Sequence, residues 1–568
     1  MQPDATVYQV GSFQPRVERT RSQIREDHIM ERIRSGDHTV WKPDPADIVN
    51  RLGWVTSPED MVPAIADIRS VVTQLQADGF THALLMGMGG SSLAPMVFRH
   101  TFGVKTGYLD LDVIDSTDPR TVADFARRLP PRRTAYIVAT KSGGTVETLS
   151  FFKYFYNETI QKTGPENAGS HFIAITDPGS RLEALGKALH FRKIFLNNPD
   201  IGGRYSALSY FGLVPAALVG MDLEKLLDRA GRMAAPDRDA GSRLGAVIGE
   251  LARSGRDKLT LILSPPISRF GAWIEQLIAE STGKEGKGIL PVDGEKLLSP
   301  DAYSNDRLFV YIRLKGDTTH NEKFQAYRRA GHPVVQIELT DLYDLGGEFF
   351  RWEMATAVAG HLLGINPFDQ PNVESAKVSA RQMLAAYQKD GKLPQPAPTL
   401  CDGTLAVYTD TPADTAGAAL AHFLAPLAAA AAQTAVNPRP YVAIQAYLQP
   451  TRKTDAALAQ LRTRIQTRTR CATTVGYGPR FLHSTGQLHK GDGGHGRFIQ
   501  ITDTPAEDIG IPDAPGESTS TITFGTLLAA QALGDRQALR DGGRAVIRLD
   551  LGTETGNGLQ KIIMETIG

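Results

Sequence analysis

The chain has few cysteines and no excess of either charge. Its 568 residues include only Cys401 and Cys471, which lie far apart and lack metal-ligand spacing. This cysteine usage fits a reducing cytoplasm, where we expect the protein to reside. Lysine and arginine together number 62, as do aspartate and glutamate. Because a neutral chain has no global field to hold nucleic acid or an anionic membrane, any anion must be bound locally.

The chain is also poor in long apolar runs. Residues Met1 to Ile24 combine Asp4 with alternating polar residues, whereas a signal peptide has a basic start followed by an apolar stretch. The most apolar segment, Ala416 to Val436, is rich in alanine but interrupted by polar residues and Pro426. We expect a buried or half-buried helix there instead of a membrane span.

Short apolar runs alternate with helix-like segments along the whole chain, which is typical of parallel sheets covered by helices. A chain of 568 residues also exceeds one ordinary core, so several packed units are expected. The candidate strands form three series: His82–Met86, Leu109–Asp115, Ala135–Thr140, Phe172–Thr176 and Lys193–Leu196; then Leu259–Ser264, Leu308–Leu314 and Val334–Leu339; then Leu405–Thr409, Tyr441–Leu448, Phe498–Thr502 and Ala545–Leu551.

Two segments separate these series. Charged helices with polar turns are predicted over Met221–Arg256, between the first series and the second. Three prolines at alternate positions in Gly391–Leu400 must end the preceding helix. We therefore predict three consecutive α/β units over residues 1–235, 236–395 and 396–568, the first with a leading helical segment.

A glycine-rich turn follows the first predicted strand. Residues Met86 to Ser92 read Met-Gly-Met-Gly-Gly-Ser-Ser and open an apparent helix with Pro95 in its first turn. Glycines let the backbone approach an anion, the helix start offers free N–H groups, and Ser91 can add a hydroxyl. Such turns also serve nucleotides or structure alone, and the lysine of a P-loop is missing. By itself this turn leaves phosphate binding and a structural role equally open.

A second polar turn follows the strand predicted over Ala135–Thr140. The run Thr140 to Thr148 contains several hydroxyls and the ammonium of Lys141 at a helix start, a combination suited to a monophosphate. Alone it would fit a hydroxyl-rich N-cap with Lys141 in solvent. Two such turns on neighbouring strands favour phosphate binding.

Together these runs resemble the phosphoglucose isomerases, which are built on paired sugar-isomerase domains. Gly87–Pro95 resembles that family's Gly-Ile-Gly-Gly-Ser turn, and Thr140–Thr148 resembles its Ser-Lys-Thr-x-Thr-Thr-x-Glu-Thr phosphate loop. The resemblance implies that the substrate phosphate is bound by Gly90, Ser91, Thr140, Lys141, Ser142 and Thr145.

Two further runs resemble catalytic elements of the family. Gly202–Ser206 resembles a Gly-Gly-Arg-Phe-Ser element, which implies that Arg204 steadies the developing enediolate. Ile274–Lys284 is similar to a signature ending in Glu-Ser-Asn-Gly-Lys. That likeness makes Glu280 the catalytic base and Gln276 a further substrate contact.

A last run, Ile365–Lys377, resembles the family's Asn-x-Phe-Asp-Gln-x-x-Val-Glu-x-x-Lys sequence. By that likeness Gln370 faces the phosphate and Lys377 assists ring opening. Each motif alone has an ordinary explanation, such as a helix-face carboxylate, a surface ion pair or a solvated lysine. Five motifs in family order are far less frequent by chance than one.

The ring-opening histidine departs from the usual family pattern. No histidine between Glu280 and Lys377 lies in the family's Gln-Leu-Ile-His-Gln-Gly context. A similar string occurs much later, in Gly478–Gly491, as in the isomerase half of bifunctional transaldolase/phosphoglucose isomerases. This resemblance implies His489 as the ring-opening group, with His483 as the alternative; His483 equally fits a buried core position.

The resemblance implies an α/β fold of two doubly wound parallel-sheet sugar-isomerase (SIS) domains plus a C-terminal α/β segment. It implies a cytoplasmic aldose-ketose isomerase of glycolysis and gluconeogenesis that interconverts glucose 6-phosphate and fructose 6-phosphate through a cis-enediol. We expect neither metal nor cofactor, since no His/Glu cluster or cysteine pair has ligand spacing. The sugar phosphate is the expected partner; a homodimer and a fused or separate transaldolase stay open.

Two other classes of protein would bind a sugar phosphate through similar turns. An aminosugar isomerase or amidotransferase module would share the phosphate loop but lack the joint Gly-Gly-Arg and Glu-Ser-x-Gly-Lys elements. A phosphosugar sensor without catalysis would have no need to retain Glu280, Arg204 and Lys377 together. The isomerase is therefore the preferred hypothesis.

Overall fold

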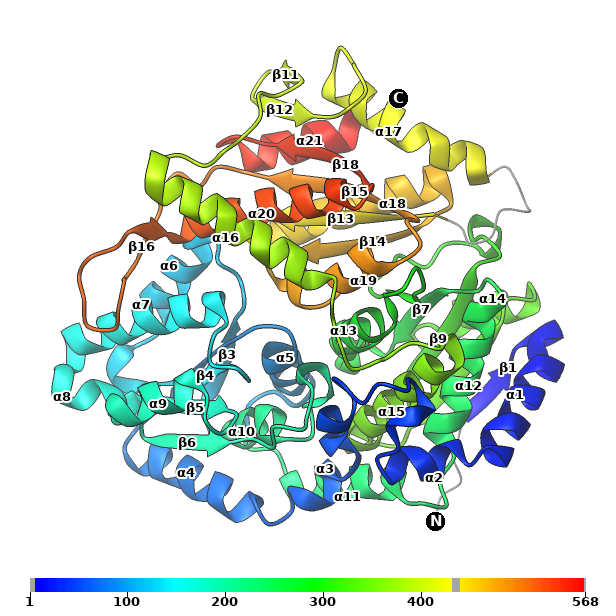
Figure 1. The fold of residues 1–568 in the computed structure, drawn as a ribbon, viewed down its shortest axis with the longest axis horizontal. Helices are drawn as coiled ribbons and strands as arrows, with labels where there is room; N and C mark the ends of the chain where they lie inside the picture. Colours follow the sequence, from blue (N-terminus) through cyan, green and yellow to red (C-terminus); the bar gives the residue numbers. More distant parts are fainter. Residues whose placement is uncertain (1–5, 432–439, 566–568) are drawn as a thin grey trace.

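The computed structural model describes residues 6–431 and 440–565, and three large sheets and one two-stranded sheet organise these residues (Figure 1). The first sheet is wholly parallel, with strand order β3-β2-β4-β5-β6. Its strands are β2 (His82–Gly87), β3 (Asp110–Ile114), β4 (Thr134–Ala139), β5 (Phe172–Thr176) and β6 (Lys193–Leu196). All six residues of β4 are buried, as expected where helices cover both faces of a parallel sheet.

The helices belonging to this sheet include one that precedes its first strand, and the others follow its strands in the chain. They are α4 (Ile65–Ala77), α5 (Gly90–Phe102), α6 (Pro119–Arg128), α7 (Val146–Thr163), α8 (Pro165–Ala168), α9 (Arg181–Ala188) and α10 (Tyr210–Leu218). Pro95 lies in the second turn of α5, not in the first as predicted. Because proline has no N–H, the Ser91 carbonyl lacks its usual helical donor.

The second sheet has the order β1-β10-β9-β7-β8, and only β1 runs antiparallel to its neighbour. Its strands are β1 (Thr6–Gln9), β7 (Lys258–Leu263), β8 (Leu290–Val292), β9 (Arg307–Leu314) and β10 (Val334–Leu339). The accompanying helices are α1 (Gln14–Glu26), α2 (Ile29–Arg34), α3 (Ser57–Asp60), α11 (Leu223–Ala234), α12 (Ala240–Arg253), α13 (Phe270–Thr282), α14 (Asn321–Arg329) and α15 (Leu345–Leu363).

The pairing of β1 corrects one detail of the predicted organisation. Residues Thr6–Gln9 pair with β10, so this part of the leading segment adds to the second sheet instead of the first unit. Backbone pairing at a sheet edge has no sequence signature beyond a short run such as Thr-Val-Tyr-Gln. The predicted boundaries at 235 and 395 stay predictions.

The third sheet has the order β11-β12-β18-β15-β13-β14. Its strands are β11 (Leu400–Asp402), β12 (Leu405–Tyr408), β13 (Tyr441–Tyr447), β14 (Ala472–Tyr477), β15 (Gly496–Thr502) and β18 (Ala545–Asp550). A separate two-stranded sheet consists of β16 (Gly510–Ile511) and β17 (Ile522–Thr523). The helices are α16 (Val373–Asp390), α17 (Ala416–Ala431), α18 (Arg452–Thr469), α19 (Gly486–Gly491), α20 (Phe524–Asp541) and α21 (Thr555–Glu565).

Helix α16 joins the second unit to the third. It packs so closely on α20 that a Cβ at Gly534 would lie 2.6 Å from the backbone nitrogen of Ala380. In Figure 1 α16 crosses the face of the third sheet beside α20. The helix ends at Asp390, followed by Gly391 with φ +68°, which glycine adopts without strain.

The predicted α/β fold class is confirmed, and the predicted strands coincide with observed ones to within about two residues. The edge strand β14 and the short strands β8, β11, β16 and β17 were not predicted, because none of them carries a long apolar run. The apolar segment Ala416–Val436 contains α17, and its residues 432–436 lie outside the described part. Among the described residues, no helix is long and apolar enough to cross a membrane.

Candidate active site

The glycine turn between β2 and α5 is the meeting point of three distant segments. A Cβ at Gly90 would lie 1.9 Å from the carbonyl oxygen of Gly203. A Cβ at Gly89, whose φ is +54°, would lie 2.8 Å from both Gln276 Nε2 and the His483 carbonyl oxygen. Only glycine fits these positions, since larger residues would displace the backbones that assemble here.

The hydroxyl-rich turn lies beside the glycine turn. Strands β2 and β4 are parallel neighbours with Gly87 opposite Ala139, so the two turns leave the same sheet edge side by side. That carboxyl edge is where ligands of open α/β sheets usually bind. The Thr140 and Thr145 hydroxyl oxygens lie 2.9 Å apart, and Ser142 Oγ accepts a 3.2 Å bond from Gly144 N–H within the loop.

Lys141, which the resemblance assigns to phosphate binding, contacts two protein groups. Its ammonium donates to the Asp177 carboxylate and, at 2.5 Å, to the Pro199 carbonyl oxygen. The positive charge of Lys141 is therefore already paired with the Asp177 carboxylate.

Arg204 is a buried, fully engaged cation at the centre of this region. Its side chain is 3% exposed, and its Nε donates to Ser281 Oγ at 2.8 Å. Its Nη1 donates to Gln370 Oε1 at 3.0 Å. Its Nη2 donates to the carbonyl oxygens of Pro367 at 2.7 Å and Asp369 at 3.0 Å. Gln370, predicted to face the phosphate, thus has its amide oxygen on Arg204.

Glu280 lies in the last turn of α13, next to that guanidinium. Its side chain is 13% exposed, with Oε1 3.4 Å from Arg204 Nη1. Gln276, one turn earlier, donates to Glu280 Oε2 at 3.0 Å and to the His483 carbonyl oxygen at 2.8 Å. The Gln276 amide oxygen is buried without a partner among the described residues. The Glu280 carboxylate, the Arg204 guanidinium and the unpartnered amide oxygen of Gln276 therefore lie close together.

A second buried cation, Lys284, was not anticipated. Its ammonium donates to the Asp369 side chain at 2.6 Å and to the Asp369 carbonyl at 2.5 Å. Burial, assisted by the positive charge of Arg204, lowers the pKa of Lys284 to about 8. This lysine fixes the loop that also supports Arg204.

His483 reaches the first unit from the C-terminal unit, at the end of the short helix Arg480–His483. Its Nε2 lies 2.8 Å from Glu147 Oε1, and its side chain is 19% exposed. Burial acts to raise the pKa of Glu147, but the interactions with His483 and Gln531 hold that pKa below its ordinary value. Glu147 stands in the first turn of α7, directly after the hydroxyl-rich turn. The sequence motif contained Glu147 without assigning it a role.

His489, the preferred sequence-based candidate, is not part of this group. Its ring is buried against Tyr441, Phe481 and Phe498. Burial lowers the pKa of His489 well below its usual range, and the charges of neighbouring cations act in the same direction. The two histidines of Gly478–Gly491 differ because His489 lies on the buried side of α19, whereas His483 precedes this helix and stays at the site.

Lys377 also lies away from the group. It is half-exposed, 47% by side chain, on α16, where its ammonium is 3.6 Å from Glu374 Oε2. The motif run that contains it is nevertheless fixed close by. Gln487 accepts from the backbone N–H groups of Asn372 and Val373 at 2.9 and 3.2 Å. It also donates to the Gly283 carbonyl at 2.9 Å, so it fastens the start of α16 to the end of α13.

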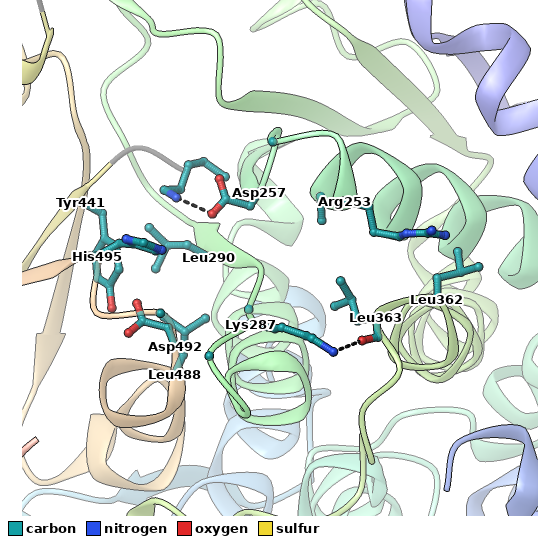
Figure 2. A pocket seen from close by; sticks show the side chains of 16 residues that line it. Arg253, Asp257, Lys287, Leu290, Leu362, Leu363, Tyr441, Leu488, Asp492 and His495 are labelled. Atoms are coloured by element: carbon teal, nitrogen blue, oxygen red, sulfur yellow. Dashed lines mark hydrogen bonds and ion pairs between the residues drawn. The ribbon is translucent and has the colours of Figure 1, made fainter. Parts of the chain in front are cut away.

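A separate cavity of about 550 Å³ lies between the second and third units (Figure 2). Its charged groups are largely paired with other protein groups: Lys258 with Asp257 at 2.6 Å, and Lys287 with the Leu363 carbonyl at 2.7 Å. It is lined by none of the predicted site residues. The convergence around Gly89 and Glu280, rather than this cavity, is therefore the candidate active site.

The fold and this site define a protein of the paired sugar-isomerase α/β class. A glucose-6-phosphate isomerase structure from Chlamydia trachomatis matches the fold with a TM-score of 0.57 and 18% identity, covering 68% of this chain and 89% of that one. The hypothetical protein TT0462 from Thermus thermophilus matches with a TM-score of 0.58 and 24% identity, covering 67% of this chain and all of that one.

Sequence relatives give the family. The phosphoglucose isomerase family model matches residues 19–289. The glucose-6-phosphate isomerase of Rubrobacter xylanophilus is 30% identical over 364 residues, covering 54% of this chain and 83% of that relative. The glucose-6-phosphate isomerase of Enterococcus faecalis is 27% identical, covering 60% and 87% respectively. The chain belongs to the phosphoglucose isomerase family, as predicted; the closer likeness to transaldolase-fused members stays a prediction.

Proposed function

We propose that this chain interconverts glucose 6-phosphate and fructose 6-phosphate, with Glu280 transferring the proton between C2 and C1. The observation that carries this proposal is the placement of Glu280 Oε1 3.4 Å from Arg204 Nη1. A single positioned carboxylate can remove the C2 proton and return it to C1. The family membership and the fold support the same reaction.

Arg204 stabilises the enediolate that this transfer creates. Its guanidinium is held by protein acceptors on every side, so it does not need to reorganise when negative charge develops on the substrate oxygens. Preorganised donors of this kind commonly contribute several kcal/mol. The free amide oxygen of Gln276 is available to accept a substrate hydroxyl.

Ring opening falls to the His483–Glu147 pair instead of His489. Opening glucose 6-phosphate breaks the C1–O5 bond while a proton moves from the C1 hydroxyl to the ring oxygen. Opening fructose 6-phosphate breaks the C2–O5 bond while a proton moves from the C2 hydroxyl to the ring oxygen, and a positioned imidazole can transfer the proton in both cases. Glu147 accepts from Nε2 of His483, and Nδ1 has no hydrogen bond to the described residues. This orientation of the ring leaves Nδ1 for the substrate. Lys377 would need to approach the site to assist.

The two turns bind the phosphate. Gly90 and Ser91 at the start of α5, with Thr140, Ser142 and Thr145 before α7, offer backbone N–H groups and hydroxyls at neighbouring helix starts. Phosphate binding far from C1 and C2 orients the reacting carbons against Glu280. Lys141 adds a positive charge at the rim while it stays paired with Asp177.

The decisive test is Glu280→Gln, followed by a coupled assay of fructose 6-phosphate conversion. We expect a loss of about 10²–10⁴-fold in turnover with phosphosugar binding nearly unchanged, since only the proton carrier is removed. Glu285→Gln is the matched control, because within the described part of the chain this exposed neighbour forms an ion pair with Lys42 alone. Near-normal turnover in Glu280→Gln would reject the mechanism.

We also propose a cytoplasmic location. Both cysteines are free, Cys401 exposed and Cys471 buried, which agrees with a reducing compartment. Detection of this chain by fractionation of its native cells would test this proposal.

A further inference from the structure

A buried glutamine of the C-terminal unit contacts the proposed ring-opening pair. Gln531 lies on α20 and is almost fully buried. Its Nε2 donates to Glu147 Oε1 at 2.6 Å, and its Oε1 accepts from Thr117 Oγ1 at 3.1 Å. Because an ionised carboxylate can only accept, the NH₂ end of the amide must face Glu147. The orientation of Gln531 is therefore defined by both partners.

Glu147 consequently has two donors on the same oxygen. His483 Nε2 lies 2.8 Å from Oε1, and Gln531 Nε2 lies 2.6 Å from it. The residue is buried between the first and third units, where an ionised carboxylate is costly unless hydrogen bonds satisfy it. Charge-assisted bonds are the strongest that an amide can supply.

We propose that Gln531 is a positioning residue for ring opening, which keeps Glu147 ionised and oriented so that His483 directs Nδ1 toward the sugar. The inference rests on the proposed function and assigns it a residue outside all five sequence motifs. Gln531 does not touch the substrate; it acts through Glu147. Its amide belongs to the C-terminal unit, so that unit contributes both the imidazole and the group that holds its partner.

The direct test is Gln531→Leu, which removes the amide and keeps the volume. Glu147 then loses one donor, so its carboxylate takes up a proton at a higher pH. We expect turnover of fructose 6-phosphate to fall about tenfold and the acidic limb of its pH profile to move up by about one unit. The open-chain analogue 5-deoxyfructose 6-phosphate, which lacks the ring-closing hydroxyl, should keep near-normal turnover.

Gln500→Leu is the matched structural control. Gln500 is also fully buried and donates to the backbone of α20, at the Ala532 carbonyl, at 3.0 Å. Its loss disturbs the same helix without touching Glu147, so the pH profile should not move. If Gln531→Leu does not fold, Gln531→Met carries the same test with a side chain of matching length.

His483→Ala separates failure of this inference from failure of the proposed function. If His483→Ala loses turnover of the cyclic sugar while Gln531→Leu keeps the wild-type pH profile, Gln531 has no positioning role and ring opening by His483 stands. Equal losses on cyclic and open-chain substrates in Gln531→Leu also overturn the inference. Wild-type turnover in His483→Ala rejects the ring-opening assignment itself.

Discussion

His483 Nε2 lies 2.8 Å from Glu147 Oε1, although 336 positions separate the two residues in the chain. Glu147 belongs to the first turn of α7 in the first unit, and His483 ends a short helix of the C-terminal unit. The carbonyl oxygen of the same histidine accepts from Gln276, which also donates to Glu280. One residue of the C-terminal unit thus connects the phosphate-loop side of the site to the catalytic-base side.

The two histidines of the C-terminal string should behave differently when replaced. His483→Ala removes the group that contacts Glu147, so we expect turnover of the cyclic sugar to fall about 10²–10⁴-fold. The folded stability should also fall, by about 1–3 kcal/mol, because the buried Glu147 carboxylate keeps only its Gln531 donor. Steady-state kinetics on fructose 6-phosphate and its open-chain analogue, with thermal melting of the same variant, would measure both effects.

His489→Ala is the companion variant and should show the opposite balance. Its ring fills space among three aromatic side chains, so the cavity left behind should cost about 2–4 kcal/mol of unfolding free energy. Activity per folded molecule should stay near normal. A selective loss of cyclic-sugar turnover in His489→Ala, with stability intact, would return the ring-opening role to His489.

Lys377 can be tested against a neighbour on its own helix. If Lys377 assists ring opening, Lys377→Ala will lower turnover at least tenfold without destabilising the fold, since exposed ion pairs contribute under about 1 kcal/mol. Arg381→Ala is the control, because Arg381 also pairs with Glu374 and is exposed. Equal activity in the two variants would mean that Lys377 remains on the outer face of α16 during catalysis.

Glu275 should make the free energy of unfolding of the protein depend on pH. Burial, and then the charge of Asp293, raises the pKa of Glu275 to about 8. An acid with a raised folded-state pKa holds extra protons when folded, so its contribution to stability is present below pH 4 or so and is lost as pH rises toward 8. Glu275→Gln should therefore gain about 3–4 kcal/mol of unfolding free energy relative to the wild-type protein as the pH rises from 5 to 8.

Chemical denaturation at several pH values would measure this gain. Glu374→Gln is the control, because the Arg381 hydrogen bond lowers the pKa of Glu374, which therefore titrates below this window. The stability difference between Glu374→Gln and the wild-type protein should be nearly constant from pH 5 to pH 8. A constant difference for Glu275→Gln as well would contradict a raised pKa for this half-buried carboxyl.

Much of the first two units could be predicted because their signals are local. Apolar runs such as Ala135–Thr140 correspond to buried strands of parallel sheets, and the glycine-rich turn at the start of α5 is recognisable from its own residues. The reason that glycine is needed there, the close approach of Gly203 and His483, came only from the structure. The proximity of Glu280 to Arg204 could be anticipated only through the family resemblance, since a separation of 76 positions in the chain gives no distance of its own.

The amino-acid sequence by itself determined the α/β class, the two anion-suited turns and the family likeness, because strand periodicity, turn chemistry and motif order depend on neighbouring residues. The tertiary structure alone decided which histidine of Gly478–Gly491 reaches the site. It also decided that Lys377 points away and that Gln531 holds Glu147. Those outcomes depend on how α16, α19 and α20 pack across unit boundaries, and contacts between distant segments leave no periodic pattern in the sequence.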